Sequence, residues 1–174
     1  RPFPAPGRGR QPARRGPPPR PPSPAAAAPT PDGYLLVLGI ILPATAIVAL
    51  VGLGGRGAAG IVLASLAAQV IIAIRVLVLV WESGAPVAYV VGGWDPPLGI
   101  ALRADGVSAV MMLTSAVIFS AAAAFAWKEY RPPRGLPESR ASLVFWSALL
   151  AMASALNTLF ASADALLESF AISP

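Results

Sequence analysis

The chain has 174 residues, of which 56% are hydrophobic and 12% charged, and its mean hydropathy of +0.68 lies outside the range of soluble globular proteins. It contains neither cysteine nor histidine, which excludes disulfides, thiolate or imidazole metal sites, haem ligation and histidine acid–base chemistry within these residues. The formal net charge of +5 does not indicate a nucleic-acid partner, because six of the thirteen basic residues lie in the first twenty positions. The composition indicates a membrane protein, and no cofactor is expected.

Residues 1–32 form a Pro/Arg-rich tail. They carry twelve of the twenty prolines and almost no side chains that a core would bury. Packing therefore cannot offset the entropy of ordering this segment, and we expect it to be disordered or polyproline-like. The run Pro-Pro-Pro-Arg-Pro-Pro at 17–22 is compatible with an SH3-like groove, although a solvated tail is the preferred interpretation. The rest of the chain, 33–174, is expected to be one transmembrane helical domain.

Four apolar blocks predict transmembrane helices. Residues 34–53 run for twenty positions without a charge, and a helix of that length spans about 30 Å, the thickness of the hydrocarbon core. Pro43 lies inside this block, and in a bundle neighbouring groups can satisfy the carbonyl that a proline frees. The other blocks are 58–81, 107–127 and 142–163. The fold class that follows is an all-α membrane protein of about four spans.

The second block contains Gln69 and Arg75, and a charge at the centre of a membrane helix costs roughly 2.5 to 3.5 kcal/mol. Arg75 lies six residues before Trp81, about 9 Å along the helix axis. Its long stem can therefore reach the interface, which is the preferred interpretation, and a buried ionic relay is the alternative. Tryptophans are typical of membrane interfaces, and all four lie near block ends: Trp81, Trp94, Trp127 and Trp146.

The loop between the second and third blocks, 82–104, predicts two short strands. Alternating apolar residues flank a Gly-Gly-Trp-Asp-Pro-Pro turn, and they are Val87, Tyr89 and Val91 before it and Leu98, Ile100 and Leu102 after it. Such a hairpin is expected outside the hydrocarbon, because unpaired strand edges are not tolerated in lipid. Asp105 follows, and we interpret its carboxylate as the N-cap of the third helix in preference to a proton-handling group.

Charge distribution predicts the topology. The loop at 128–140 carries four basic residues against two acids, which places it in the cytoplasm by the positive-inside rule. Helix parity then puts the N-terminus on the non-cytoplasmic side, although the tail arginines alone favour the opposite orientation. Small residues at 121–124 and 151–155 predict helix faces that pack closely against other helices. Asn157 is expected to hydrogen-bond a neighbouring helix and not a ligand.

Residues 92–113 hold a patterned polar island: a Gly-Trp loop at Trp94, a Pro-Leu-Gly-Ile turn into a strand, and Asp105-Gly106-x-Ser108 opening an apolar helix. This pattern resembles the early part of the antiporter-like membrane subunits. These are the ion-translocating subunits of respiratory complex I, of multisubunit Na+/H+ antiporters (the D-type subunit most of all) and of membrane-bound hydrogenases. The resemblance implies a bacterial inner-membrane location and a non-cytoplasmic hairpin. It covers about 34–166, which corresponds to the opening helices of a much larger bundle.

Residues 157–166, Asn-Thr-Leu-Phe-Ala-Ser-Ala-Asp-Ala-Leu, are similar to the Asn-Gly-x-Phe-x-Thr-Gly-Asp-Leu-Phe run that joins helices four and five of the D-type subunits. Asn157, Phe160 and Asp164 match outright. In that family the following helix carries a glutamate central to ion translocation, which by straight alignment falls near Ser173. The nearby acid here is Glu168, which lies about 140° away around a helix. The ion-translocation candidates are therefore Glu168, Asp164 and Arg75.

The expected function is a membrane subunit, as an N-terminal part or a shortened form, of a multisubunit cation/proton antiporter or a related proton-translocating respiratory complex. The resemblance implies other membrane subunits as partners and H+ or Na+ as the transported ion, and no enzymatic activity of the chain alone is expected. The alternative is a non-transporting structural or assembly subunit that packs its helices against larger partners.

Overall fold

The structure, a computed structural model, describes residues 30–53, 57–91, 100–130 and 139–171, with the backbone alone at 100, 101 and 163–171. The elements are α1 (Tyr34–Gly52), α2 (Ala58–Ser83), β1 (Val87–Val91), β2 (Ile100–Ala104), α3 (Gly106–Glu129) and α4 (Arg140–Ala171). All four helices include a segment long and apolar enough to cross a membrane. The predicted four-span helical fold is confirmed, and the first three helices begin and end within two residues of the predicted blocks.

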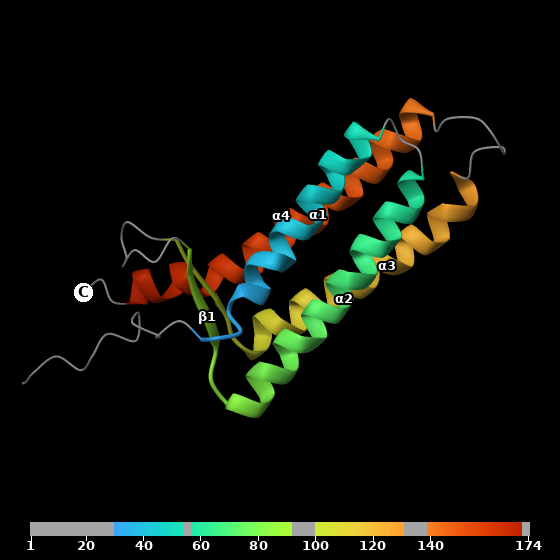
Figure 1. Ribbon diagram of the computed structural model, residues 1–174. Coiled ribbons are helices and arrows are strands. Elements are labelled where there is room, and N and C mark those ends of the chain that lie inside the picture. Colours follow the sequence, from blue (N-terminus) through green and yellow to red (C-terminus); the bar gives the residue numbers. More distant parts are fainter. Residues whose placement is uncertain (1–29, 54–56, 92–99, 131–138, 172–174) are drawn as a thin grey trace, which may run out of the picture.

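The helices form an elongated bundle with the hairpin at one end (Figure 1). Helix α1 packs against α2 and α4, and α3 packs against the same two neighbours. The hairpin lies where α1 begins, α2 ends and α3 begins, and β2 also contacts the C-terminal part of α4. The two ends of the bundle are therefore different: one carries the hairpin, and the other carries the ends of α1 and α3 and the starts of α2 and α4.

The two strands pair antiparallel, from Val87 opposite Ala104 to Val91 opposite Ile100. This confirms the predicted hairpin, whereas the turn at 92–99, with Leu98 of the predicted second strand, lies outside the described residues. Thr30 joins the hairpin on the other side of β1: its amide and its hydroxyl both donate to the Ala88 carbonyl at 3.0 Å. Thr30 belongs to the range assigned to the tail, of which 1–29 lie outside the described residues. The chain is thus attached to the hairpin before α1 begins.

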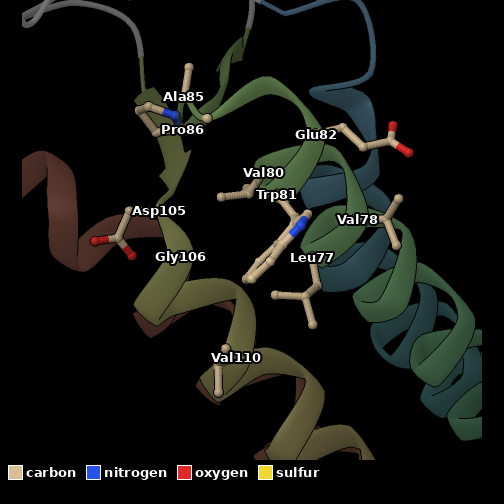
Figure 2. Close-up of a pocket in the computed structure, with 11 residues that line it drawn as sticks. Leu77, Val78, Val80, Trp81, Glu82, Ala85, Pro86, Asp105, Gly106 and Val110 are labelled. Atoms are coloured by element: carbon tan, nitrogen blue, oxygen red, sulfur yellow. The ribbon is translucent and has the colours of Figure 1, made fainter.

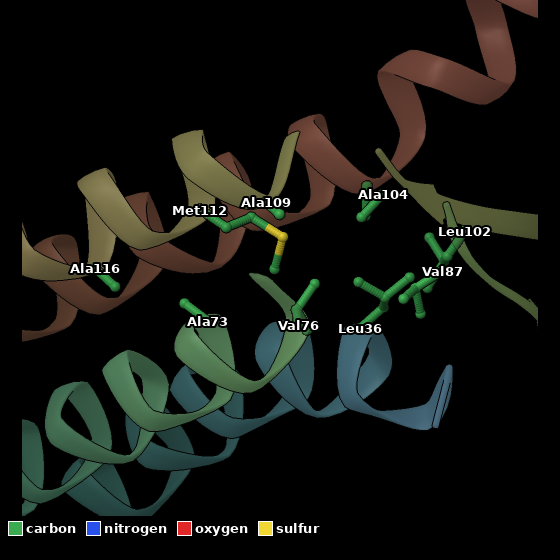
Figure 3. Close-up of a cluster of buried hydrophobic side chains, with 10 residues drawn as sticks. Leu36, Ala73, Val76, Val87, Leu102, Ala104, Ala109, Met112 and Ala116 are labelled. Atoms are coloured by element: carbon green, nitrogen blue, oxygen red, sulfur yellow. The ribbon is translucent and has the colours of Figure 1, made fainter. Parts of the chain in front are cut away.

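Apolar packing is divided into two clusters along the bundle. The cluster nearest the hairpin (Figure 3) consists of Leu36, Ala73, Val76, Val87, Leu102, Ala104, Ala109, Met112, Ala116 and Ala161. The cluster at the far end consists of Ala46, Leu50, Ala58, Val62, Leu66, Ala123, Ala126, Trp146, Leu150 and Ala153. Many members are alanines, whose small side chains let helices approach closely. The alanine-rich stretches contribute one buried residue each, Ala123 and Ala153, while most of their neighbours face outward.

Helix α4 differs from the expectation based on resemblance. The run at 157–166 was expected to join two helices, but the backbone remains helical from Arg140 to Ala171. The two glycines of the family pattern are replaced here by Thr158 and Ala163. Glycine is the weaker helix former and alanine the strongest, so this segment lacks the local signal that ends a helix.

Trp146 was expected at the membrane interface, and this prediction is wrong. Its side chain is 0% exposed, and its ring lies edge-on to Phe145 at 5.2 Å and to Tyr130 at 6.2 Å. Tyr130, the residue after α3, stacks on Phe145 at 4.7 Å. The aromatic contacts therefore hold the end of α3 against the start of α4. By contrast, Trp81 is 85% exposed, as expected of an interfacial residue, and Trp94 lies outside the described residues.

We expect the change Gly33→Ala to loosen the contact between α1 and the hairpin. A Cβ at Gly33 would clash with the Ala88 carbonyl oxygen and lie 3.0 Å from Cβ of Tyr89. The backbone must then shift, at a cost of about 1–3 kcal/mol, measured as the free energy of unfolding in mixed detergent micelles. Gly60→Ala in α2 is the control, because a Cβ there meets open space. Equal stability of the two variants would contradict the close approach at Gly33.

Candidate functional site

The most constrained polar feature of the bundle begins at Pro43, inside α1. In an α-helix the N–H of each residue bonds the carbonyl four residues earlier, and proline has no N–H. The Gly39 carbonyl is therefore left without a partner in its own helix. Pro43 is fully buried, and lipid provides no hydrogen-bond donor to replace the missing one.

Two side-chain amides from other helices supply the missing donors. Asn157 of α4 donates from Nδ2 to the Gly39 oxygen at 2.9 Å, and Gln69 of α2 donates from Nε2 to the same oxygen at 3.4 Å. A carbonyl oxygen has two lone pairs and can accept both bonds. The next carbonyl, that of Ile40, accepts from the Ser154 hydroxyl at 3.0 Å. We call these five residues the Gly39 cluster, and it joins α1, α2 and α4 at one level.

The Gly39 cluster lies between the two apolar clusters. Along each helix its members are flanked by core residues of both: Leu36 and Ala46 on α1, Leu66 and Ala73 on α2, and Ala153 and Ala161 on α4. Asn157 is 0% and Gln69 3% exposed. The other amide atoms, Oδ1 of Asn157 and Oε1 of Gln69, have no hydrogen-bond partner among the described residues. The cluster is a neutral polar layer inside an apolar bundle.

The Gly39 cluster has a structural role: its hydrogen bonds hold three helices together. Amides and hydroxyls of this kind do not ionise near neutral pH, so these side chains hold a geometry and carry no charge. Asn157 was expected to bond a neighbouring helix, and this prediction is confirmed. The sequence places Gln69 and Pro43 inside two different spans, but it does not show that Gln69 bonds the Gly39 carbonyl that Pro43 frees. The sequence could have identified the acceptor, because the residue four positions before Pro43 is Gly39, and its carbonyl is the one that lacks a donor within the helix.

Asp105 caps α3 as predicted. Its Oδ1 accepts from the Ser108 amide at 2.7 Å, and its backbone carbonyl accepts from the Ala109 amide at 2.9 Å. The extended backbone of Asp105, with φ −88° and ψ −172°, is typical of an N-cap. Gly106 begins the helix, and Ser108 is buried in its first turn. The Asp-Gly-x-Ser motif therefore starts α3 directly after β2.

The predicted ion-translocation residues do not meet at the Gly39 cluster. Arg75 is exposed on α2, beside the exposed Ile71, Ile74 and Val78. Asp164 and Glu168 lie on the backbone of α4 beyond Asn157, and their side chains lie outside the described residues.

A cavity of about 930 Å³ separates the end of α2 from the start of α3 (Figure 2). Its walls are mainly apolar, with Leu77, Trp81 and Val110 among the lining residues. Two acids, Glu82 and Asp105, lie at its border on opposite sides, and the Asp105 carboxylate is engaged in the α3 cap. The cavity therefore offers hydrocarbon surface and not a converging set of polar groups.

In comparisons with known proteins, the chain matches no family and no curated protein.

We predict an energetic coupling between Pro43 and Asn157. Asn157→Leu leaves the Gly39 carbonyl with the longer Gln69 bond alone and should destabilise the bundle by about 0.6–1.7 kcal/mol, the range found for hydrogen bonds between membrane helices. Pro43→Ala restores an N–H that can bond Gly39 within α1, so Asn157→Leu should cost less in that background. Unfolding free energies of the four proteins in mixed micelles give the coupling.

Thr158→Ala provides the matched control for this cycle. Thr158 is the neighbour of Asn157 on α4 and is exposed, and among the described residues its hydroxyl donates to the Ser154 carbonyl of its own helix alone. It should show no coupling with Pro43→Ala. Strictly additive effects of Pro43→Ala and Asn157→Leu would show that the Asn157 bond does not replace the amide that proline lacks.

We further expect Asp105→Ala to cost about 0.5–2 kcal/mol, because the Ser108 amide loses its acceptor at the start of α3. Asp105→Asn should retain most of the stability, since an asparagine oxygen caps a helix nearly as well. Hydrogen exchange at the Ser108 amide is the direct measurement: it should accelerate in the alanine variant and much less in the asparagine variant. Equal acceleration in both would mean that the cap is not what protects this amide.

Proposed function

We propose that this chain is a membrane-embedded subunit, as an N-terminal part or a shortened form, of a multisubunit cation/proton antiporter or a related proton-translocating respiratory complex. The observation that carries the proposal is the unit formed by the hairpin, the Asp105 cap and α3. The hairpin and the cap lie between the second and third spans, which agrees with the pattern on which the resemblance of residues 92–113 rests. The proposed location is a bacterial inner membrane, with the N-terminus and the hairpin on the non-cytoplasmic side.

The second support is the role of Asn157, one of three positions at which 157–166 matches the D-type run outright. Its side chain is fully buried and bonds the carbonyl that Pro43 frees. The hydrogen bond gives Asn157 a structural role that does not depend on ion binding. In the proposed complex, α1, α2 and α4 form a unit joined by hydrogen bonds, and further membrane helices pack against it.

The outer surface of the bundle supports a role among other membrane subunits. Large apolar side chains are exposed on all four helices, for example Val48 on α1, Ile71 on α2, Phe125 on α3 and Val144 on α4. Such a surface suits lipid and partner helices alike. The transported ion in the proposal is H+ or Na+, moved by the assembled complex and not by this chain alone.

One observation favours the alternative of a non-transporting structural or assembly subunit. Among the described residues, every buried polar side chain is neutral: Ser65, Gln69, Ser108, Ser142 and Asn157. The described part of the bundle interior therefore serves helix packing. The two functions differ in whether Glu168 or Asp164 of α4 takes part in transport.

The test is cation-dependent proton movement in inner-membrane vesicles from the source organism. After respiration acidifies the lumen of everted vesicles, added NaCl should collapse the pH gradient, as reported by dequenching of acridine orange. Vesicles that lack this chain should retain the gradient, and restoring the chain should restore the collapse. Equal collapse with and without the chain would refute the Na+/H+ antiporter form of the proposal.

We predict that Glu168→Gln lowers this flux while the complex stays assembled, because a carboxyl group that carries protons or cations cannot be replaced by an amide. Asp164→Asn is the parallel variant, and native gel electrophoresis reports assembly. Normal flux in both variants, with normal assembly, would remove both acids from the ion path and leave the structural role as the better account.

A further inference from the structure

Arg75 is a charged residue on the outer face of a membrane helix. It is exposed, and the large residues around it on α2, Ile71, Ile74 and Val78, are also exposed. Helix α2 packs against α1 and α3 through its other faces. In the part of the chain that the structure describes, no hydrogen bond or ion pair engages the Arg75 guanidinium.

The depth of Arg75 follows from the length of α2. The helix has 26 residues, about 39 Å at 1.5 Å per residue, which exceeds a hydrocarbon core of about 30 Å. Arg75 lies eight residues before the helix end at Ser83, about 12 Å along the axis. If the hydrocarbon is centred on the helix, the boundary falls near Trp81, whose high exposure suits that position. The Cα of Arg75 then lies about 8 Å inside the boundary.

The Arg75 side chain does not point toward that boundary. In an α-helix each Cα–Cβ bond tilts toward the N-terminus, and long side chains continue over the preceding turn. For Arg75 this direction leads toward the middle of the membrane, because the nearer boundary lies at the C-terminal end of α2. Residue number alone favoured snorkelling toward Trp81, whereas the polarity of the helix favours a counter-ion at the same depth.

The acid nearest to Arg75 on its own helix face does not serve as that counter-ion. Glu82 follows Arg75 by seven residues, two turns or about 10.5 Å along the axis. Figure 2 shows the Glu82 and Val78 side chains on the side of α2 opposite Asp105, at the border of the cavity that both residues help to line. The outer face of α2 is therefore a stripe of apolar side chains with one cation deep within it.

We propose that the stripe formed by Ile71, Arg75 and Val78 docks a transmembrane helix of a neighbouring subunit, and that this helix carries an Asp or Glu level with Arg75. The inference rests on the proposed membership of a multisubunit complex and names the chemistry of one contact in it. The planar guanidinium can bind both oxygens of a carboxylate, and the surrounding apolar side chains exclude water from the pair. A carboxylate in a partner helix would also lie on the N-terminal side of Arg75, which is the direction in which a side chain on a helix points.

The first test is recovery of the complex from native membranes through an affinity tag on the full chain, in mild detergent. Arg75→Glu places two like charges at the contact and should lower recovery of the partner subunit about tenfold or more. Arg75→Gln should lower it less, and Arg75→Lys, which keeps the positive charge, should retain most of it. The amount of each variant in the membrane is measured in parallel, so that lost insertion is distinguished from lost docking.

The second test identifies the partner helix. A photo-crosslinking amino acid at Ile71 or Val78 should attach to a membrane helix that contains Asp or Glu, whereas the same group at Val48, exposed on α1, should not attach to that helix. Replacement of the identified carboxylate by Arg should restore recovery with the Arg75→Glu chain. This reciprocal rescue is the result that a merely structural effect of Arg75 does not give.

Two outcomes overturn the proposal, and they differ in what else they remove. If Arg75→Glu and Arg75→Gln recover the same subunits as the wild type in the same amounts, and the crosslinks reach lipid alone, the docking contact is wrong while the proposed function stands. If the wild-type chain recovers no other membrane subunit, the proposed function fails together with the docking contact.

Discussion

The structure depends on one backbone oxygen, the carbonyl of Gly39, that its own helix cannot satisfy. Pro43 removes the donor, and the surrounding hydrocarbon offers none. The donors come from Asn157, 118 positions away in the chain, and from Gln69 on the neighbouring helix. Hydrogen bonds tolerate changes of only a few tenths of an ångström in the donor–acceptor distance, so the Asn157 bond at 2.9 Å and the longer Gln69 bond limit how far α4 and α2 can shift along the axis of α1. The apolar clusters on either side of this level, which are less directional, then pack in the register that the amides impose.

A different set of contacts fixes the positions of the helix ends beside the hairpin. Thr30 bonds β1 before α1 begins, Gly33 lets the chain pass close to the Ala88 carbonyl, and Asp105 starts α3 directly after β2. Each contact joins a helix terminus to the hairpin or to its edge. As a result, the starts of α1 and α3 are attached to one small sheet, although 58 positions separate Thr30 from Ala88. This arrangement gives Thr30, Gly33 and Asp105 structural roles where the hairpin meets the helices.

The buried polar side chains of the described bundle are neutral, whereas the charged Arg75 lies on the outer surface of the bundle. Buried amides bring three helices to one level without the cost of burying an ion, which is large in hydrocarbon. Arg75 lies instead on the outer face of α2, where it is exposed. In the docking proposed above, a neighbouring helix supplies the counter-ion of Arg75, whereas the Gly39 cluster is satisfied by helices of this chain. The proposed function and the proposed docking stripe therefore rest on different residues.

The amino-acid sequence by itself determined the number and limits of the first three spans, the hairpin between the second and third, and the cap at Asp105, because each depends on local composition, periodicity or hydrogen bonding within a few residues. It also predicted that Asn157 bonds another helix, since an amide inside an apolar run has few other uses in lipid. Only the tertiary structure decided that the acceptor is Gly39, that Gln69 shares it, and that Trp146 is buried against Tyr130 and Phe145. The bonds to Gly39 and the contact of Trp146 with Tyr130 connect different helices, and hydrophobicity, which is non-directional, does not specify which helix faces meet. Helix α4 combines the two cases: its residues favour a helix locally, but the resemblance at 157–166 pointed to a junction between two helices, and the structure shows one continuous helix from Arg140 to Ala171.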